Sequence, residues 1–136
     1  MKIMLDKGAK MPTRAHPWDA GLDLYAMEEF NVPMKQSVTV DTGVHVEIPE
    51  GYVGLVKSKS GLMTRSSIKT DGTIDSHYNG SLRVCLFNHG ITPYRFKAGD
   101  KIAQLVIVPC LLPELELVDS LEETDRGDKG FGSTGR

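Results

Sequence analysis

Apolar and polar residues alternate along much of this chain, which is the pattern of β-strands that bury one face. The alternating apolar positions are Val38, Val40, Val44, Val46, Ile48, Val53, Leu55, Leu82, Val84, Leu86, Leu115 and Leu117. Ile102–Val108 is an almost continuous apolar run and predicts a strand buried on both faces. Because no long window carries a helical stripe, one short helix near residues 61–67 is the only helix expected.

Turn-forming residues interrupt these segments roughly every 8 to 12 residues. They fall at 41–43, 71–73, 79–80, 88–90 and 98–100. Many short strands between such turns predict an all-β protein with a jelly-roll-like β-sandwich. We expect residues 1–125 to form a single β domain, and the glycine-rich residues 126–136 to form a flexible C-terminal arm.

Composition and charge exclude several classes of protein. A chain of 136 residues is one domain with room for a core, and its formal net charge of −2 lacks the basic character of nucleic-acid-binding proteins. No apolar run approaches the roughly 18 residues of a membrane span, and the start of the chain does not read as a secretory signal. A cytoplasmic location is expected, in the host if the chain is viral.

Cysteine and histidine usage argues against structural cross-links. Cys85 and Cys110 lie in apolar runs and are expected to be reduced core residues, not disulfide partners or zinc ligands. The four histidines form no ligand-spaced pair, so no structural metal is expected.

The last eleven residues combine groups that suit a nucleotide. Closely spaced glycines let backbone N–H groups approach phosphate oxygens, and Arg126, Ser133 and Thr134 add side-chain donors. Phe131 offers a face on which a base can stack. By itself the segment is either a solvated Gly/Ser tail or an arm that closes over a nucleotide.

Four internal segments also carry chemical groups in strand or turn context. Residues 20–24 place Asp23 between apolar neighbours, and residues 56–62 combine lysines, serines and a glycine, which suits an anion at a turn or helix start. Residues 72–80 read as a glycine-bounded hairpin that carries Asp75 and Tyr78. The alternative for each of these three is a turn with solvated charges.

The fourth segment is the apolar strand that Gln104 interrupts. A buried amide needs hydrogen-bond partners, so Gln104 is either a structural amide bonded to a neighbouring loop or a side chain that points into a site.

Together these segments resemble the trimeric deoxyuridine triphosphatases (dUTP diphosphatases, dUTPases). The five family motifs appear in order as Ala-Gly-Leu-Asp-Leu (20–24), Lys-Ser-Lys-Ser-Gly-Leu (57–62), Gly-Thr-Ile-Asp-Ser-His-Tyr-Asn-Gly (72–80), Gly-Asp-Lys-Ile-Ala-Gln-Leu (99–105) and Arg-Gly-Asp-Lys-Gly-Phe-Gly-Ser-Thr-Gly (126–135). The resemblance implies a dUTPase-like β-sandwich. It also implies hydrolysis of dUTP to dUMP and pyrophosphate, which limits uracil incorporation into DNA and supplies dUMP for dTMP synthesis.

The resemblance assigns the reaction to one carboxylate. It implies that Asp75 orients and deprotonates the water that attacks the α-phosphorus, and that Tyr78 packs under the deoxyribose. The backbone near Gly72 would read the uracil edge. Further implied substrate-binding residues are Lys59, Ser60, Gly61, Gln104 and Arg126 for the phosphates, and Phe131, Gly132, Ser133 and Thr134 from the arm.

Cofactor and assembly follow from the same resemblance. Mg²⁺ would be held by the substrate phosphates and water without direct protein ligands, and Asp23 would lie near it, acting through water or by shaping the site. Each active site of the homotrimer would be shared: the first, second and fourth motifs come from one chain, the 72–80 segment from a second and the arm from a third.

Four positions depart from the family pattern. Lys59 and Lys101 stand where arginine is usual, which keeps the charge but loses the bidentate fork. His77 replaces an acid before Tyr78, and Trp18 stands where small residues are common. These departures affect the expected rate and pH optimum, not the reaction class.

Two alternatives remain beside this interpretation. A dCTP deaminase on the same scaffold would need a glutamate where Cys85 stands. A non-catalytic nucleotide-sensing protein would not need the combination of Asp75, Tyr78 and Phe131 that this chain has.

Overall fold

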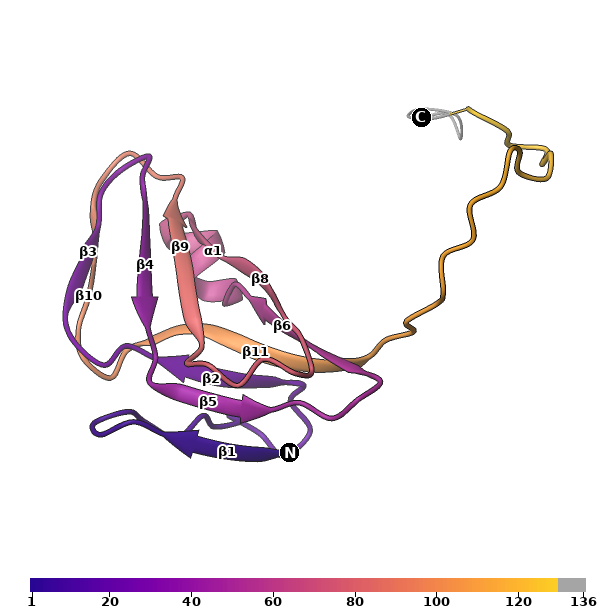
Figure 1. Cartoon of the computed structure of the whole chain (residues 1–136). Helices are drawn as coiled ribbons and strands as arrows, with labels where there is room; N and C mark the ends of the chain where they lie inside the picture. The colour runs from indigo at the N-terminus through magenta and orange to yellow at the C-terminus, as the bar shows by residue number, and fades with distance from the viewer. Residues whose placement is uncertain (130–136) are drawn as a thin grey trace.

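The computed structural model describes residues 1–129, and these form eleven short strands and one helix (Figure 1). The elements are β1 (Lys2–Leu5), β2 (Gly21–Tyr25), β3 (Phe30–Val32), β4 (Ser37–Asp41), β5 (Val44–Glu47), β6 (Tyr52–Lys57), α1 (Ser60–Ser66), β7 (Ile68–Lys69), β8 (Asp71–Ile74), β9 (Arg83–Asn88), β10 (Tyr94–Phe96) and β11 (Lys101–Pro109). The all-β expectation is confirmed, and the helix begins one residue before the predicted segment.

The strands form two larger sheets and two strand pairs. One sheet has the order β2-β11-β6-β8 and the other the order β4-β9-β7, while β1 pairs with β5 and β10 with β3. All of these pairings are antiparallel. Strands far apart in sequence therefore become neighbours, which brings the first four motif segments to one sheet.

Inward-facing residues of these sheets make a shared apolar core. Alternation along β9 shows how it forms: Val84 and Leu86 are fully buried, whereas Arg83, Cys85 and Phe87 face outward. The prediction that Cys85 is a core residue is therefore wrong, because its register places it on the outer face. Cys110 is half-buried, and both cysteines are free thiols.

The prediction that Ile102–Val108 is buried on both faces holds for only part of that run. Ile102, Ala103 and Leu105 are buried, but residues 106–108 are half-buried. β2 pairs with β11 only as far as Gly21, which lies opposite Val106, so beyond this point the side chains of β11 have neighbours on β6 alone to pack beside.

The hairpin predicted at residues 72–80 is a connection between sheets instead. β8 pairs with β6, whereas β9 pairs with β4 and β7. Residues 75–80, called here the 75–80 turn, therefore lead from one sheet to the other. The turn is closed by a hydrogen bond from the Tyr78 N–H to the Asp75 carbonyl oxygen at 3.1 Å.

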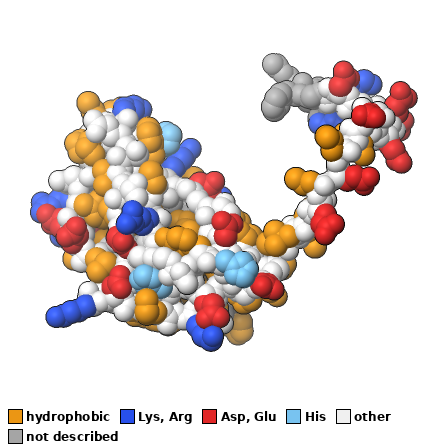
Figure 2. All heavy atoms as spheres, viewed as in Figure 1, with side chains coloured by type: hydrophobic (Ala, Val, Ile, Leu, Met, Phe, Trp, Pro, Cys, Tyr) orange, Lys and Arg blue, Asp and Glu red, His pale blue; other side chains and the backbone are white. Residues whose placement is uncertain are grey.

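Residues 110–129 leave the body as an extended segment (Figure 1). The strand predicted at Leu115 and Leu117 does not form, and both side chains are almost fully exposed because no strand of the same chain lies beside them. Figure 2 shows hydrophobic and acidic side chains along this segment. Within residues 1–129, no helix is long and apolar enough to cross a membrane.

Candidate active site

Four strands of one sheet place residues from separate motifs in a single row. Asp23 on β2 lies opposite Gln104 on β11, Gln104 lies opposite Lys57 on β6, and Lys57 lies opposite Asp71 on β8. Lys57 also pairs with the Asp71 carboxylate, and its hydrogen bond holds the pKa of Asp71 below the usual value. The first, second and fourth motifs thus meet at this row.

Asp23 is a buried carboxylate between two ammonium groups. Its Oδ1 accepts a hydrogen bond from Lys59 Nζ, and its Oδ2 lies 2.6 Å from Lys101 Nζ. Burial alone would raise the pKa of Asp23, but the hydrogen bonds and charges of Lys101 and Lys59 outweigh it, so the pKa is lowered. The same contact raises the pKa of Lys101. Two of the departures from the family pattern therefore converge on one acid.

The described residues do not provide a set of side chains that could coordinate a metal ion directly. Among residues 1–129, no group of three or more His, Cys, Asp or Glu side chains is arranged to hold an ion. Both oxygens of Asp23 already face lysine ammonium groups. Protein carboxylates at this row therefore do not fit a direct magnesium site.

Gln104 is both a structural amide and part of a cavity wall. Its Nε2 donates to the Ser58 carbonyl oxygen at 3.0 Å, and the half-buried side chain lines a cavity of about 360 Å³ together with Gly21, Asp23 and Lys59. A Cβ atom at Gly21 would overlap Gln104 Oε1. The glycine of the first motif is therefore required so that the amide can lie over β2.

The second motif ends at the start of α1. The first N–H groups of the helix, at Ser60 and Gly61, have no acceptor within the helix. The N-cap residue, Lys59, makes no side-chain hydrogen bond that would cap them. Before this point Ser58 Oγ accepts from the Thr70 N–H at 2.8 Å and donates to the Thr70 carbonyl oxygen at 2.9 Å. These two bonds fix the approach of β6 to the helix.

The 75–80 turn forms a second, separate set of site residues. Asp75 is exposed, and the Tyr78 hydroxyl donates to the Ser81 carbonyl oxygen at 2.9 Å while its ring lies over Gly80. Asp75 and Tyr78 line a cavity of about 210 Å³ with Arg83, which the sequence analysis did not single out. The sequence gives little indication of a role for Arg83, because charged residues are common at the outward positions of an alternating strand.

A single chain does not bring the two sets together. On β8, Asp71 belongs to the row, and Ile74 lies three residues farther along the strand. At roughly 3.3 Å per residue, Ile74 is about 10 Å from the row, and Asp75 is farther still. The cavities beside Asp23 and beside Asp75 share no lining residue.

The two remaining predicted positions that the structure describes lie at edges of the molecule. Gly72 is on β8, the edge strand of its sheet, where alternate backbone groups point away from β6. Arg126 lies in the extended segment, and its Nε donates to the Lys129 carbonyl oxygen at 3.3 Å. Phe131, Gly132, Ser133 and Thr134 lie outside the described residues.

The other two departures from the family pattern lie on the surface. Trp18 is 89% exposed. His77 Nε2 lies 3.5 Å from Glu50 Oε1, with both side chains exposed. Neither residue is buried against the row that carries Asp23.

Comparison with known proteins covers nearly the whole chain. A dUTPase family model matches residues 7–135. The deoxyuridine 5'-triphosphate nucleotidohydrolase of Nocardia farcinica is 44% identical over 135 residues, covering 96% of this chain and 82% of the relative. A protein of Schizosaccharomyces pombe named as a probable enzyme of the same kind is 46% identical over 132 residues, covering 96% and 94%.

Solved structures agree in fold. The Staphylococcus bacteriophage 80alpha dUTPase with dUPNHPP superposes with a TM-score of 0.92 at 34% identity, over 99% of this chain and 98% of the phage protein. A variant of the dUTPase from phage phi11 of S. aureus, described with a coordinated structural Mg(II) ion, gives 0.83 at 33% identity, over 90% and 98%. On its motifs, its sheet arrangement and these matches, the chain belongs to the dUTPase family.

Proposed function

We propose that this chain hydrolyses dUTP to dUMP and pyrophosphate by attack of water on the α-phosphorus. The observation that carries the proposal is the family match over residues 7–135, which spans every motif placed above. The relatives that match over most of their length are named for this activity. The 75–80 turn carries an exposed carboxylate. Apart from it lies the cationic row, which is the row from Asp23 to Asp71 together with the ammonium groups of Lys59 and Lys101. These supply the two kinds of group that the reaction needs.

Asp75 is the proposed base. As an exposed carboxylate at the end of β8 it can accept the proton of an attacking water. Tyr78, held by its bond to Ser81, gives a fixed ring face for the deoxyribose. The outward backbone groups of the edge strand near Gly72 are suited to the hydrogen-bonding edge of uracil.

The row at Asp23 is the proposed triphosphate site. Lys59 supplies a cation, the uncapped N–H groups of Ser60 and Gly61 supply donors, and Gln104 supplies an amide in the same cavity wall. Arg126 and the arm residues 131–134 are proposed to reach the γ-phosphate and the base. Since the described residues do not fit a direct metal site, we place Mg²⁺ on the substrate phosphates and water, where it neutralises phosphate charge.

The active site is proposed to be shared within a homotrimer. Two observations support this: the two halves of the site do not meet within one chain, and residues 110–121 expose apolar side chains that touch no core. The exposed leucines are Leu111, Leu112, Leu115, Leu117 and Leu121. Such a segment is stabilised by burial on another surface, and a neighbouring copy provides one. Residues 1–125 would then be the β domain and 126–136 the arm that covers a neighbour's site.

Product analysis tests the proposed activity. The purified chain is incubated with Mg²⁺ and either dUTP or dCTP, and pyrophosphate and ammonia are measured. We expect pyrophosphate from dUTP and no ammonia from dCTP. Ammonia from dCTP would support the deaminase alternative. No product from either nucleotide, with dUPNHPP still bound, would support a nucleotide-sensing protein.

A further inference from the structure

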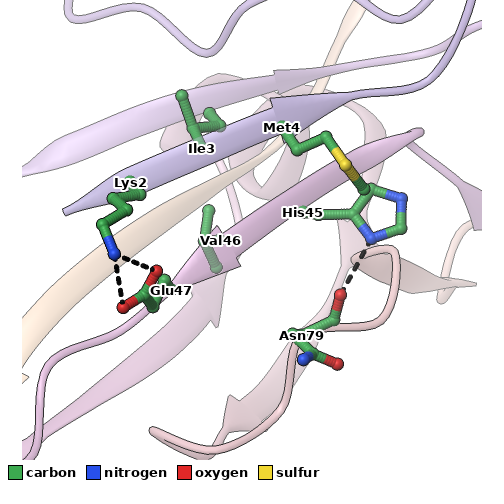
Figure 3. A pocket seen from close by; sticks show the side chains of 7 residues that line it. All are labelled: Lys2, Ile3, Met4, His45, Val46, Glu47 and Asn79. Atoms are coloured by element: carbon green, nitrogen blue, oxygen red, sulfur yellow. Dashed lines mark hydrogen bonds and ion pairs between the residues drawn. The ribbon is translucent and has the colours of Figure 1, made fainter.

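The imidazole of His45 connects the 75–80 turn to β5 and to the loop after β1. Its Nδ1 lies 2.9 Å from the backbone carbonyl oxygen of Asn79 (Figure 3). Its Nε2 lies 3.3 Å from Oδ2 of Asp6. Only 18% of the side chain is exposed. Asn79 belongs to the turn that carries Asp75 and Tyr78, so His45 contacts that turn from outside the proposed site.

Both partners of His45 accept hydrogen bonds and neither donates. A backbone carbonyl and an ionised carboxylate have only lone pairs to offer, whereas a neutral imidazole has one donor nitrogen and one acceptor nitrogen. The neutral ring would therefore turn a lone pair toward either Asn79 or Asp6. Only the imidazolium donates to both, which identifies the protonated ring as the form that this geometry favours.

The charged groups around His45 favour the same form. The bond to the Asn79 carbonyl, followed by the bond to Asp6, raises the pKa of His45 above its ordinary value although burial lowers it, and the charges of Asp6 and Asp41 add to the increase. Asp41 on β4 is the second acid nearby, and it also bonds Ser81 and lies 3.8 Å from Arg83.

β1, the strand that pairs with β5, adds no net charge near His45. Met4 on β1 lies opposite His45. Lys2 and Glu47 lie 3.0 Å apart and neutralise each other. The charges that raise the pKa of His45 are those of Asp6 and Asp41.

We propose that His45 is a positioning residue for the proposed hydrolysis, which as an imidazolium holds the 75–80 turn against β5 and so fixes where Asp75 points. This inference rests on the proposed role of Asp75. Other anchors hold the chain just after the turn: the Leu82 N–H donates to the Val44 carbonyl oxygen at 2.8 Å, and Ser81 bonds Asp41. The His45 contact reaches the turn itself, at Asn79.

The direction of the pH effect follows from the raised pKa. Below the ordinary histidine value, about 6.5, the ring is protonated in every state, and the contact is complete. As the pH rises through the higher value of the folded protein, the ring loses one proton. The remaining proton stays on Nε2, which faces the Asp6 carboxylate, the stronger acceptor, so the donation to Asn79 is lost. Loss of the contact with Asn79 should therefore appear as a decline of kcat on the alkaline side.

Two uncharged variants separate the two contacts. In His45→Asn the amide nitrogen takes the position of Nδ1 and can still donate to Asn79. In His45→Gln the amide nitrogen reaches the position of Nε2 and can donate only to Asp6. We expect the Asn variant to stay within about threefold of the wild-type maximum and to lack the alkaline decline, while the Gln variant loses roughly ten- to a hundredfold in kcat, with a smaller change in KM for dUTP.

Asp6→Asn provides the matched electrostatic control. It removes the negative charge beside Nε2 and keeps the ring, so the alkaline decline should move to lower pH. Circular dichroism and light scattering confirm that each variant keeps the fold and assembly of the wild type. Equal kcat-pH profiles for the wild type, the Gln variant and Asp6→Asn would overturn the inference.

An NMR titration distinguishes failure of this inference from failure of the proposed function, because it uses no substrate. The His45 ring and the backbone amides of residues 75–80 are followed against pH. We expect the ring to titrate above about 6.5 and the turn amides to shift with the same midpoint. A ring that titrates at or below that value, or turn amides that do not respond, would overturn the inference even if dUTP is not hydrolysed.

Discussion

At the residue scale, the lysines of the cationic row differ from the arginines usual in the family because each presents a single charged point. Lys59 and Lys101 both point at Asp23, one to each carboxylate oxygen. A guanidinium could bind a phosphate and a carboxylate through different N–H groups, whereas an ammonium is a compact charge that two anions must share. At the proposed triphosphate site, Asp23 would therefore compete with the substrate phosphates for Lys59.

Replacing Asp23 should make stability less dependent on acid pH. Because the pKa of Asp23 is lowered in the folded state, its contribution is present above the ordinary aspartate value of about 3.9 and is lost as the pH falls through the lower folded value. We expect Asp23→Asn to reduce the free energy of unfolding at pH 7 by about 1–3 kcal/mol. Urea denaturation should show this deficit shrinking below about pH 4.

Glu50→Gln is a suitable control for that measurement, because Glu50 is an exposed carboxylate whose contact with His77 is 3.5 Å long. It should change stability little at any pH. A deficit for Asp23→Asn that stays constant from pH 7 to pH 3 would contradict the electrostatic account.

Replacing Asp75 should separate binding from hydrolysis. Asp75→Asn keeps the shape of the side chain but cannot accept a proton from water, so kcat for dUTP should fall by about 10²–10⁴-fold or more. Calorimetry with dUPNHPP should show affinity close to that of the wild type, since Asp75 is not among the residues proposed to hold the phosphates. Near-normal turnover would remove Asp75 from the proposed mechanism.

At the element scale, alternation predicted strands well where the partner strand lies in the same chain. The alternating segments that became β5 and β9 bury their predicted residues, whereas Val38 and Val40 of β4 are partly buried against the core. The helix forms within one residue of its predicted start. The segment at Leu115 has the same alternation but no strand beside it within the chain. Alternation of apolar and polar residues indicates that one face of a strand is buried, but it does not identify the surface that covers that face.

Pairing between distant strands explains most of what the sequence could not predict about the site. The row from Asp23 to Asp71 exists because β2 pairs with β11 and β6 pairs with both β11 and β8. The spacing of these residues along the chain does not indicate the order of the strands in the sheet. The motif residues were found through resemblance, whereas Arg83 and His45 were missed because neither belongs to a motif segment.

The end of α1 offers a test of local backbone strain. Ser67 ends the helix in the left-handed region at φ 55°, where a residue with a Cβ atom is disfavoured. Ser67→Gly should raise the free energy of unfolding by about 0.5–1 kcal/mol, the relief of strain exceeding the added chain entropy. Thermal unfolding measures the change.

The neighbouring position gives the matched control. Ser66 is the last residue of α1, so Ser66→Gly adds chain entropy without relieving strain and should lower stability by a few tenths of a kcal/mol. If both glycine variants shift stability in the same direction, the strain at Ser67 is not the cause.

At the scale of the whole molecule, the chain has two features that one copy leaves incomplete. The cationic row and the 75–80 turn lie apart, and the apolar segment 110–121 has no surface of its own chain to cover it. Assembly into a trimer would address both, because a symmetric arrangement repeats the same contact at every interface. In such a trimer, burial of the C-terminal segment and completion of the active site would occur together.

Two truncations separate assembly from closure of the site. A chain that ends at Asp125 keeps the leucines of the extended segment and should remain a trimer by light scattering, yet it lacks Arg126 and Phe131, so its turnover of dUTP should fall steeply. A chain that ends at Cys110 also lacks those leucines and should lose the trimer. Ordering the arm costs about 1–2 kcal/mol per residue in backbone entropy, which phosphate and stacking contacts must offset in the complex. Full turnover by the chain ending at Asp125 would show that the arm is not needed to complete the site.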